Sequence, residues 1–209
     1  MTSSLSTQQS DSEPLRLAVL VGSTRPGRRS YLVAEWAAHL AREALTGRAE
    51  VSIIDIAEFD LPLLDEPQPA AIGDYRHEHT RRWADAIAAA DGFIIVTPEY
   101  NHSLTPALKN AIDYLYAEWH DKAAGFVSFG LNGGVRAVEH LRLTLSEVKV
   151  ACVRSQVALD LFTDFAFDDV SEPGTVQPGE RHVRLFERML DELLQWSAAL
   201  RPLRVSVPA

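Results

Sequence analysis

The sequence of 209 residues contains a single cysteine and no long apolar run. One cysteine cannot form an intramolecular disulfide, so a reducing cytoplasm is the expected location. Cys152 lies in the apolar run 150–153. This setting predicts a small buried core residue rather than a catalytic thiol, because an unpaired cysteine is usually buried.

Positive charge is also scarce. The chain has 20 Lys and Arg residues against 29 Asp and Glu residues, which gives a formal net charge of -9. Nucleic acids require a basic surface, so we expect no nucleic-acid partner. No apolar stretch approaches the roughly 20 residues that cross a bilayer, so we expect no membrane partner either.

The usual nucleotide motifs are missing too. The chain has neither the Gly-Lys-Ser/Thr of a P-loop nor the G-x-G-x-x-G of a dinucleotide fold. We also predict no metal site. What the chain does have is 46% hydrophobic residues, which suits one compact domain over residues 14–209. Residues 1–13 are rich in Ser, Thr and Gln and lack the basic and apolar regions of a signal peptide, so we expect a disordered tail.

Apolar strand-like runs alternate with helical patterns along the chain. Strands are expected at 15–21, 51–56, 92–97, 123–129 and within 150–161, and helices at 30–45, 75–90, from 106 onward, 134–147 and 181–200. The connections 59–73 and 162–180 appear irregular. Five strand–helix repeats predict an α/β three-layer sandwich, in which a parallel sheet has helices on both faces. Five strands favour the flavodoxin-like order 2-1-3-4-5, whose ligand crevice opens after strands 1 and 3.

The loop that follows the first strand, residues 22–30, is rich in hydroxyls and arginines. Ser23, Thr24 and Ser30 can donate hydroxyl hydrogen bonds, and Arg25 can grip a phosphate through two donors. The helix after the loop adds free N–H groups and the positive end of its dipole. We therefore predict a phosphate site, with Ser30 also capping the helix. A polar turn with solvated arginines is the alternative.

The loop after the third strand, residues 97–103, favours a flat ligand. Pro98 stiffens it, Tyr100 offers a flat face, and Asn101 offers a donor and an acceptor side by side. A planar heterocycle with carbonyl and imide edges needs such a set. Glu99 could face a helix dipole or another subunit.

The loop after the fourth strand is rich in glycine. Ser128, Gly130, Gly133 and Gly134 could let main-chain amides approach a ligand. An ordinary turn between a strand and a helix is the alternative. Because this loop is expected beside the other two, we give ligand binding the same weight as the ordinary turn.

Four segments together resemble the NADPH-dependent FMN reductase family, over about residues 15–200. They are Gly-Ser-Thr-Arg-Pro-Gly-Arg-Arg-Ser at 22–30, Pro-Glu-Tyr-Asn-His-Ser at 98–103, Leu-Lys-Asn-Ala-Ile-Asp at 108–113 and Gly-Gly-Val-Arg-Ala at 133–137. The second and third segments are the specific part of the resemblance. The glycine turn alone is a weak signal.

The resemblance implies a flavodoxin-like fold and FMN as cofactor. In such proteins the loop matching Ser23, Arg25 and Ser30 holds the FMN phosphate. The segment matching Pro98–Asn101 lies along the isoalloxazine ring, and the segment matching Ser128–Gly134 borders the flavin on another side. Homodimers or homotetramers are also implied.

The implied activity is that of an NAD(P)H oxidoreductase. A hydride is expected to pass from NADPH, with NADH as the alternative donor, to bound FMN, and electrons then reach a flavin, quinone or other flat acceptor in a ping-pong scheme. The flavin carries the chemistry, so we expect no catalytic side chain. Arg25, Arg28 and Arg29 are candidates for the 2′-phosphate of NADPH.

Two other functions fit the same fold. One is a flavodoxin-type electron carrier without NAD(P)H activity, which the acidic charge suits. The other is a flavin-free scaffold. Trp119 and His120 could form an exposed apolar patch covered by a partner subunit, or they could tuck under the following strand.

Overall fold

A computed structural model describes residues 13–205. The predicted disordered tail therefore lies outside the described residues except for Glu13. None of the helices within 13–205 is both long enough and apolar enough to cross a membrane.

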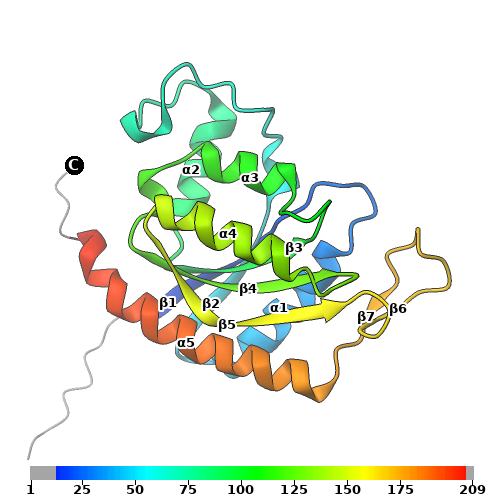
Figure 1. Cartoon of the computed structure of the whole chain (residues 1–209). Helices are drawn as coiled ribbons and strands as arrows, with labels where there is room; N and C mark the ends of the chain where they lie inside the picture. The colour runs from blue at the N-terminus through cyan, green and yellow to red at the C-terminus, as the bar shows by residue number, and fades with distance from the viewer. Residues whose placement is uncertain (1–12, 206–209) are drawn as a thin grey trace, which may run out of the picture.

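Five parallel strands form the central sheet (Figure 1). They are β1 (Leu15–Val21), β2 (Ala49–Asp55), β3 (Gly92–Pro98), β4 (Lys122–Gly130) and β5 (Val150–Asp160). Their order is β2-β1-β3-β4-β5, which confirms the predicted topology. Every residue of β3 is buried, as a strand covered on both faces should be.

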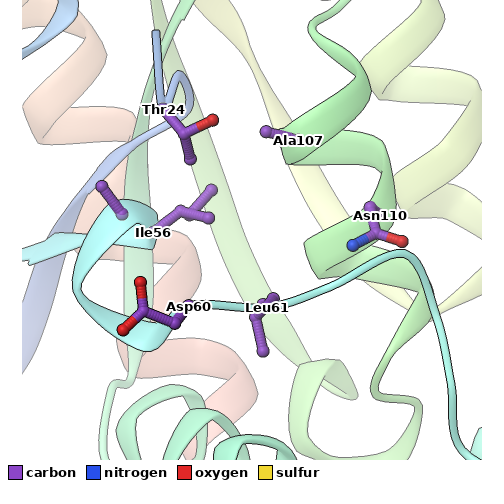
Figure 2. A pocket seen from close by; sticks show the side chains of 7 residues that line it. Thr24, Ile56, Asp60, Leu61, Ala107 and Asn110 are labelled. Atoms are coloured by element: carbon purple, nitrogen blue, oxygen red, sulfur yellow. The ribbon is translucent and has the colours of Figure 1, made fainter. Parts of the chain in front are cut away.

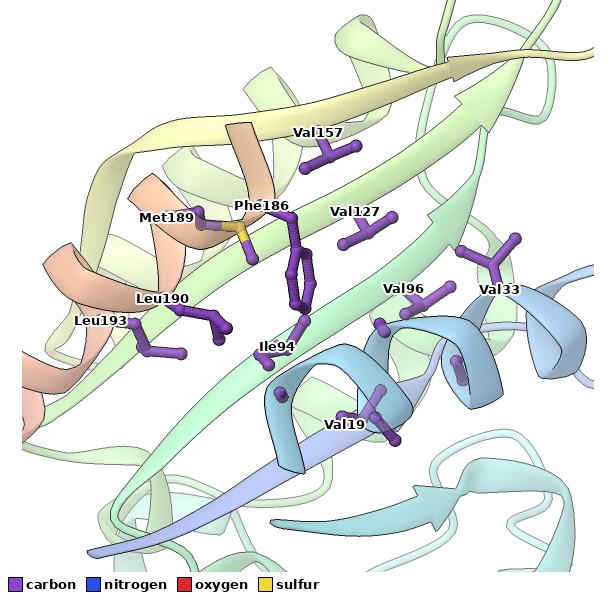
Figure 3. Close-up of a cluster of buried hydrophobic side chains, with 14 of the residues drawn as sticks. Val19, Val33, Ile94, Val96, Val127, Val157, Phe186, Met189, Leu190 and Leu193 are labelled. Atoms are coloured by element: carbon purple, nitrogen blue, oxygen red, sulfur yellow. The ribbon is translucent and has the colours of Figure 1, made fainter. Parts of the chain in front are cut away.

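Helices cover both faces of the sheet and complete the three layers (Figure 1). On one face lie α1 (Ser30–Ala44) and α5 (Glu180–Val205), whose apolar side chains pack on the sheet (Figure 3). On the other face lie α2 (Glu78–Ala88), α3 (Pro106–Asp113) and α4 (Val135–Glu147). Two apolar cores result, one on each side of the strands.

The connections hold more structure than the sequence indicates. Short 3-10 helices occur at η1 (Ile56–Phe59), η2 (Ala70–Ile72) and η3 (Ala117–Trp119). The predicted irregular stretch 162–180 contains an antiparallel hairpin of β6 (Phe165–Ala166) and β7 (Thr175–Val176). The second helix begins at Glu78 rather than 75, because the amides of Arg76 and His77 donate to the carboxylate of Glu66 instead.

Two side chains from the sequence analysis find clear positions. Trp119 is fully buried, packs against Phe93 and donates from Nε1 to the carbonyl of Ile112 at 3.2 Å. An exposed patch at Trp119 is therefore wrong, and the tucked alternative is confirmed. Cys152 is only partly buried, yet burial still raises the pKa of its thiol to about 11.

The carboxyl ends of β1 and β3 approach each other closely. A Cβ at Gly22 would lie 2.7 Å from the carbonyl oxygen of Val96, so no larger residue fits there. The hydroxyl of Thr105 donates to the Gly22 carbonyl at 2.5 Å and accepts from the amide of Leu108 at 3.1 Å. Thr105 is thus the N-cap of α3, as predicted, and it fastens that helix to the turn after β1.

Candidate functional site

The three predicted loops meet at the carboxyl edge of the sheet. The hydroxyls of Ser23 and Tyr100 lie 3.2 Å apart, which joins the first loop to the second. The amide of Glu99 donates to the carbonyl of Phe129 at 3.1 Å, which joins the second loop to the third. One continuous surface therefore carries all three loops.

A small cavity lies between the β1 turn and the start of α1. Its volume is about 40 Å³, which exceeds the roughly 10–15 Å³ that one water occupies. It is therefore large enough for a small tetrahedral group. Most of its lining comes from the first loop, with the rest from the turns after β3 and β4. The lining residues include Ser23, Arg25, Gly27, Arg28, Ser30, Pro98 and Tyr100.

Donor groups without a partner face this cavity. Ser30 is fully buried, and its hydroxyl has no hydrogen-bond partner within the described residues. The predicted cap is wrong, because α1 begins at Ser30 itself and Arg29 occupies the N-cap without a side-chain hydrogen bond. The first amides of α1 are consequently uncapped, and no acidic residue lies in the first turn. An anion would satisfy both the hydroxyl and the amides.

The three arginines of the loop have different environments. Arg28 forms an ion pair with Asp55 at the end of β2. Arg29 donates to the carbonyls of Val170 and Pro173 at 2.9 and 3.0 Å. Arg25 is exposed, and its guanidinium has no partner in the chain from 13 to 205. Arg25 is therefore the arginine available to a ligand.

Arg29 also fixes the connection that follows β5. Besides its other carbonyl acceptors it donates to the carbonyl of Glu172 at 2.5 Å, and its guanidinium lies 4.5 Å from the centre of the Phe167 ring. The pKa of Arg29 is lowered, first by burial and then by the positive charge of Arg25. The connection between β6 and β7 is thereby tied to the rim of the small cavity.

The second turn presents its tip to solvent. Tyr100 and Ser103 exchange backbone hydrogen bonds of 2.9 and 3.1 Å. Asn101 and His102 between them have positive φ angles of 48° and 73° and are exposed. The tip is therefore a tight turn that holds the Asn101 side chain at the surface, next to Tyr100 of the small cavity.

The third turn is closed by its own polar groups. Ser128 donates from its hydroxyl to the carbonyl of Gly133 at 2.6 Å. Gly134 has a φ of +70°, and a Cβ there would lie 2.8 Å from the amide nitrogen of Phe129. Only glycine fits, because the backbone at this position packs directly against Ser128 and Phe129. The hydroxyl of Ser128 itself is already used within the turn.

Glu99 joins the second turn to the start of α4. Its carboxylate accepts from the guanidinium of Arg136 at 2.7 Å and from the amide of Arg136 at 3.2 Å. The expected contact with a helix N-terminus is thus confirmed. The side chain of Glu99 holds the two turns in register, and the backbone of this segment is what remains for a ligand.

Thr24 occupies a different position from the other loop residues. It lines a larger cavity of about 390 Å³ between the β1 turn, η1 and α3 (Figure 2). Sequence reasoning did not identify the residues around it: Ile56, Asp60, Leu61, Ala107 and Asn110. The signal was available in part, since residues just after β2 must reach the same carboxyl edge as those after β1 and β3. Within the described residues, no group of three or more His, Cys, Asp or Glu side chains is placed to hold a metal ion.

Comparison with known proteins gives a consistent result. The model of the NADPH-dependent FMN reductase family matches residues 15–164. An NAD(P)H-dependent FMN reductase of Schizosaccharomyces pombe is 33% identical over 160 residues, which cover 76% of this chain and 79% of that protein. A quinone reductase of Escherichia coli is 36% identical over 141 residues, covering 64% and 71% of the two chains.

The fold has solved relatives as well. The NAD(P)H:acceptor oxidoreductase FerB of Paracoccus denitrificans superposes with a TM-score of 0.67 over 88% of this chain and 98% of that chain, at 23% identity. A flavodoxin of Bacillus cereus superposes with a TM-score of 0.52 at 15% identity, over 86% of this chain and 97% of that one. The flavodoxin-like fold predicted from the sequence is confirmed.

Proposed function

The chain belongs to the NADPH-dependent FMN reductase family, and on that premise we propose that it is an FMN-dependent NAD(P)H oxidoreductase that reduces a flavin, a quinone or another flat acceptor. Family membership makes it an oxidoreductase. The cofactor site, the order of the steps and the acceptor belong to the proposal.

The small cavity beside α1 carries the assignment of FMN. Among the residues that the structure describes, it combines a buried hydroxyl without a partner on Ser30, an uncapped helix N-terminus and the unpaired guanidinium of Arg25. A phosphate supplies the acceptors that all three lack. The residues present therefore fit the phosphate of FMN, with Ser23 adding a second hydroxyl.

The flavin ring is assigned to the neighbouring turns. Backbone groups of Pro98–Asn101 and of the turn at Gly130, Gly133 and Gly134 would border it, because the Glu99 and Ser128 side chains are already engaged. Main-chain amides at these positions favour negative charge on the pyrimidine edge of the ring. Thr24 lines the adjacent larger cavity, so it is not part of the proposed phosphate site.

When bound, FMN would supply the redox chemistry of hydride acceptance from NAD(P)H and electron transfer to a second acceptor. The chain's own residues hold the phosphate, orient the ring and keep one face open. No side chain needs to transfer a proton, so no catalytic residue is assigned. A homodimer or homotetramer is part of the proposal.

The decisive test uses purified FMN-loaded protein without oxygen. Addition of NADPH or NADH should bleach the flavin absorbance within seconds, and a quinone added afterwards should restore it. A flavin that stays oxidised with both donors would identify an electron carrier instead. Protein that binds no FMN on soaking would identify a flavin-free scaffold.

A further inference from the structure

The 390 Å³ cavity lies on the opposite side of the β1 turn from the phosphate site. Thr24 lines this cavity, whereas its neighbours Ser23 and Arg25 line the smaller one. The segments after β1 and β2 and the first turn of α3 form its walls. Open α/β sheets bind ligands at this edge, and the volume lies in the usual range for small-molecule sites.

The lining has two kinds of surface. Ile56, Leu61 and Ala107 provide apolar walls, and Figure 2 shows Thr24 and Ala107 on opposite sides of the opening. Thr24 contributes a hydroxyl and Asp60 a carboxylate, and neither has a hydrogen-bond partner among residues 13–205. Apolar walls with a few unpaired polar groups are typical of ligand sites.

One wall of the cavity is held in place by α3. Asn110 donates from Nδ2 to the carbonyl of Pro62 at 2.6 Å and accepts from the amide of Leu64 at 2.9 Å. Tyr114, one turn further along, donates to the carboxylate of Asp65 at 2.9 Å. These bonds fix the segment that follows Asp60, so the cavity exists before any ligand arrives.

We propose that this cavity binds the adenosine half of the pyridine dinucleotide, an assignment that rests on the proposed function. Its apolar walls suit a flat base, while the hydroxyl of Thr24 and the carboxylate of Asp60 suit ribose hydroxyls. A phosphate would be repelled by the unpaired carboxylate, so this is not a second phosphate site. The nicotinamide half would extend toward the turns after β3 and β4.

A binding experiment tests the cavity without any turnover. ADP-ribose, which lacks nicotinamide, is titrated by calorimetry into FMN-loaded protein. Ala107→Trp fills the cavity and should weaken binding roughly tenfold or more, because a packed site does not accommodate added bulk. The control Lys109→Trp adds the same ring to an exposed position on the same helix and should bind as the parent does. Parent-like binding by the Ala107 variant, or no binding by the parent, would overturn the assignment.

A kinetic experiment separates this inference from the proposed function. Reduced nicotinamide mononucleotide carries the hydride but no adenosine. Ala107→Trp should raise the KM for NADH roughly tenfold more than the KM for the mononucleotide. Equal loss with both donors would contradict the cavity assignment. If the parent flavin is reduced by neither donor, the proposed function fails, while the ADP-ribose titration still decides what the cavity binds.

Asp60 offers a second variant that does not depend on filling the cavity. Its φ is +49°, a conformation that asparagine tolerates, so Asp60→Asn removes charge with little strain. Affinity for 2′-phospho-ADP-ribose should rise roughly tenfold relative to ADP-ribose, because a like charge is removed. An unchanged ratio would overturn the placement of the ribose beside Asp60.

Discussion

Several charged groups at the amino and carboxyl ends of the same five strands have different environments. At the amino end, Asp91 accepts from the amide of Arg16 at 2.8 Å and pairs with Arg204. Lys122 donates to the carbonyl of Ile87 at 2.6 Å. At the carboxyl end, the Ser30 hydroxyl, the Arg25 guanidinium and the first amides of α1 lack partners among the described residues. The paired groups stabilise the amino end, and under the proposed function the unpaired donors at the carboxyl end are available to a ligand.

The largest expected effect comes from the amino end. Asp91→Ala leaves Arg204 and the Arg16 amide without their buried acceptor, and should lower the free energy of unfolding by about 3 kcal/mol. FMN affinity of the folded protein should not change. Urea unfolding and flavin titration measure the two quantities, with the exposed Asp85→Ala as control. A large loss of FMN affinity would contradict the view that the amino end contributes to stability alone.

Two glycines at the carboxyl end differ in the space that surrounds them, and their substitution should therefore cost different amounts of stability. Gly134→Ala should cost about 2–3 kcal/mol of stability, because the new Cβ meets the Phe129 backbone and φ is positive. Gly27 has a similar φ of +68° but nothing within 4 Å of its would-be Cβ. Gly27→Ala should therefore cost only about 1 kcal/mol. Thermal unfolding of both variants makes the comparison, and equal losses would contradict it.

Arg25→Ala should affect ligand retention alone. Loss of one charge-assisted hydrogen bond to phosphate corresponds to roughly tenfold to hundredfold weaker FMN binding. The unfolding midpoint of the flavin-free protein should stay the same, since the Arg25 guanidinium has no hydrogen-bond or ion-pair partner within the described chain. Arg184→Ala, on the exposed side of α5, is the matched control. A variant that keeps parental FMN affinity would show that the phosphate lies elsewhere.

Lys122 gives the smallest effect and a pH signature. Burial lowers its pKa from 10.5 to about 7. Between these values the unfolded chain holds a proton that the folded chain has released, so stability should rise with pH from 7 toward 10. Lys122→Met should flatten that rise by on the order of 1 kcal/mol, as urea unfolding at pH 7 and pH 9 would show. An identical slope in both proteins would mean that Lys122 stays charged when folded.

The strands were predictable because their signal is local. The run 92–97 is apolar throughout, and β3 is buried at every position. Thr105 and Pro106 likewise predict the start of α3, because they are its N-cap and its first residue. The alternation of strands and helices favours the observed strand order. That order in turn predicts that the three loops meet at one edge of the sheet.

What the sequence did not reveal depends on distant partners. Arg29 looked available to a phosphate, but carbonyls more than 140 residues away occupy it. The sequence predicts that Ser30 caps α1, but the helix starts one residue earlier than a capping serine requires, and the hydroxyl has no partner within residues 13–205. The cavity beside Asp60 needed the Asn110 clamp, which joins segments 46 and 48 residues apart.

The hydrogen bonds from Arg29 to the connection between β6 and β7 have an evolutionary consequence. Arg29 recognises only main-chain oxygens of Val170, Glu172 and Pro173, and every residue type supplies such an oxygen. Substitutions at these three positions can alter the shape and polarity of the connection between β6 and β7, while its hydrogen bonds to Arg29 are kept. The sequence of this connection can therefore change between related proteins without loss of its attachment to Arg29.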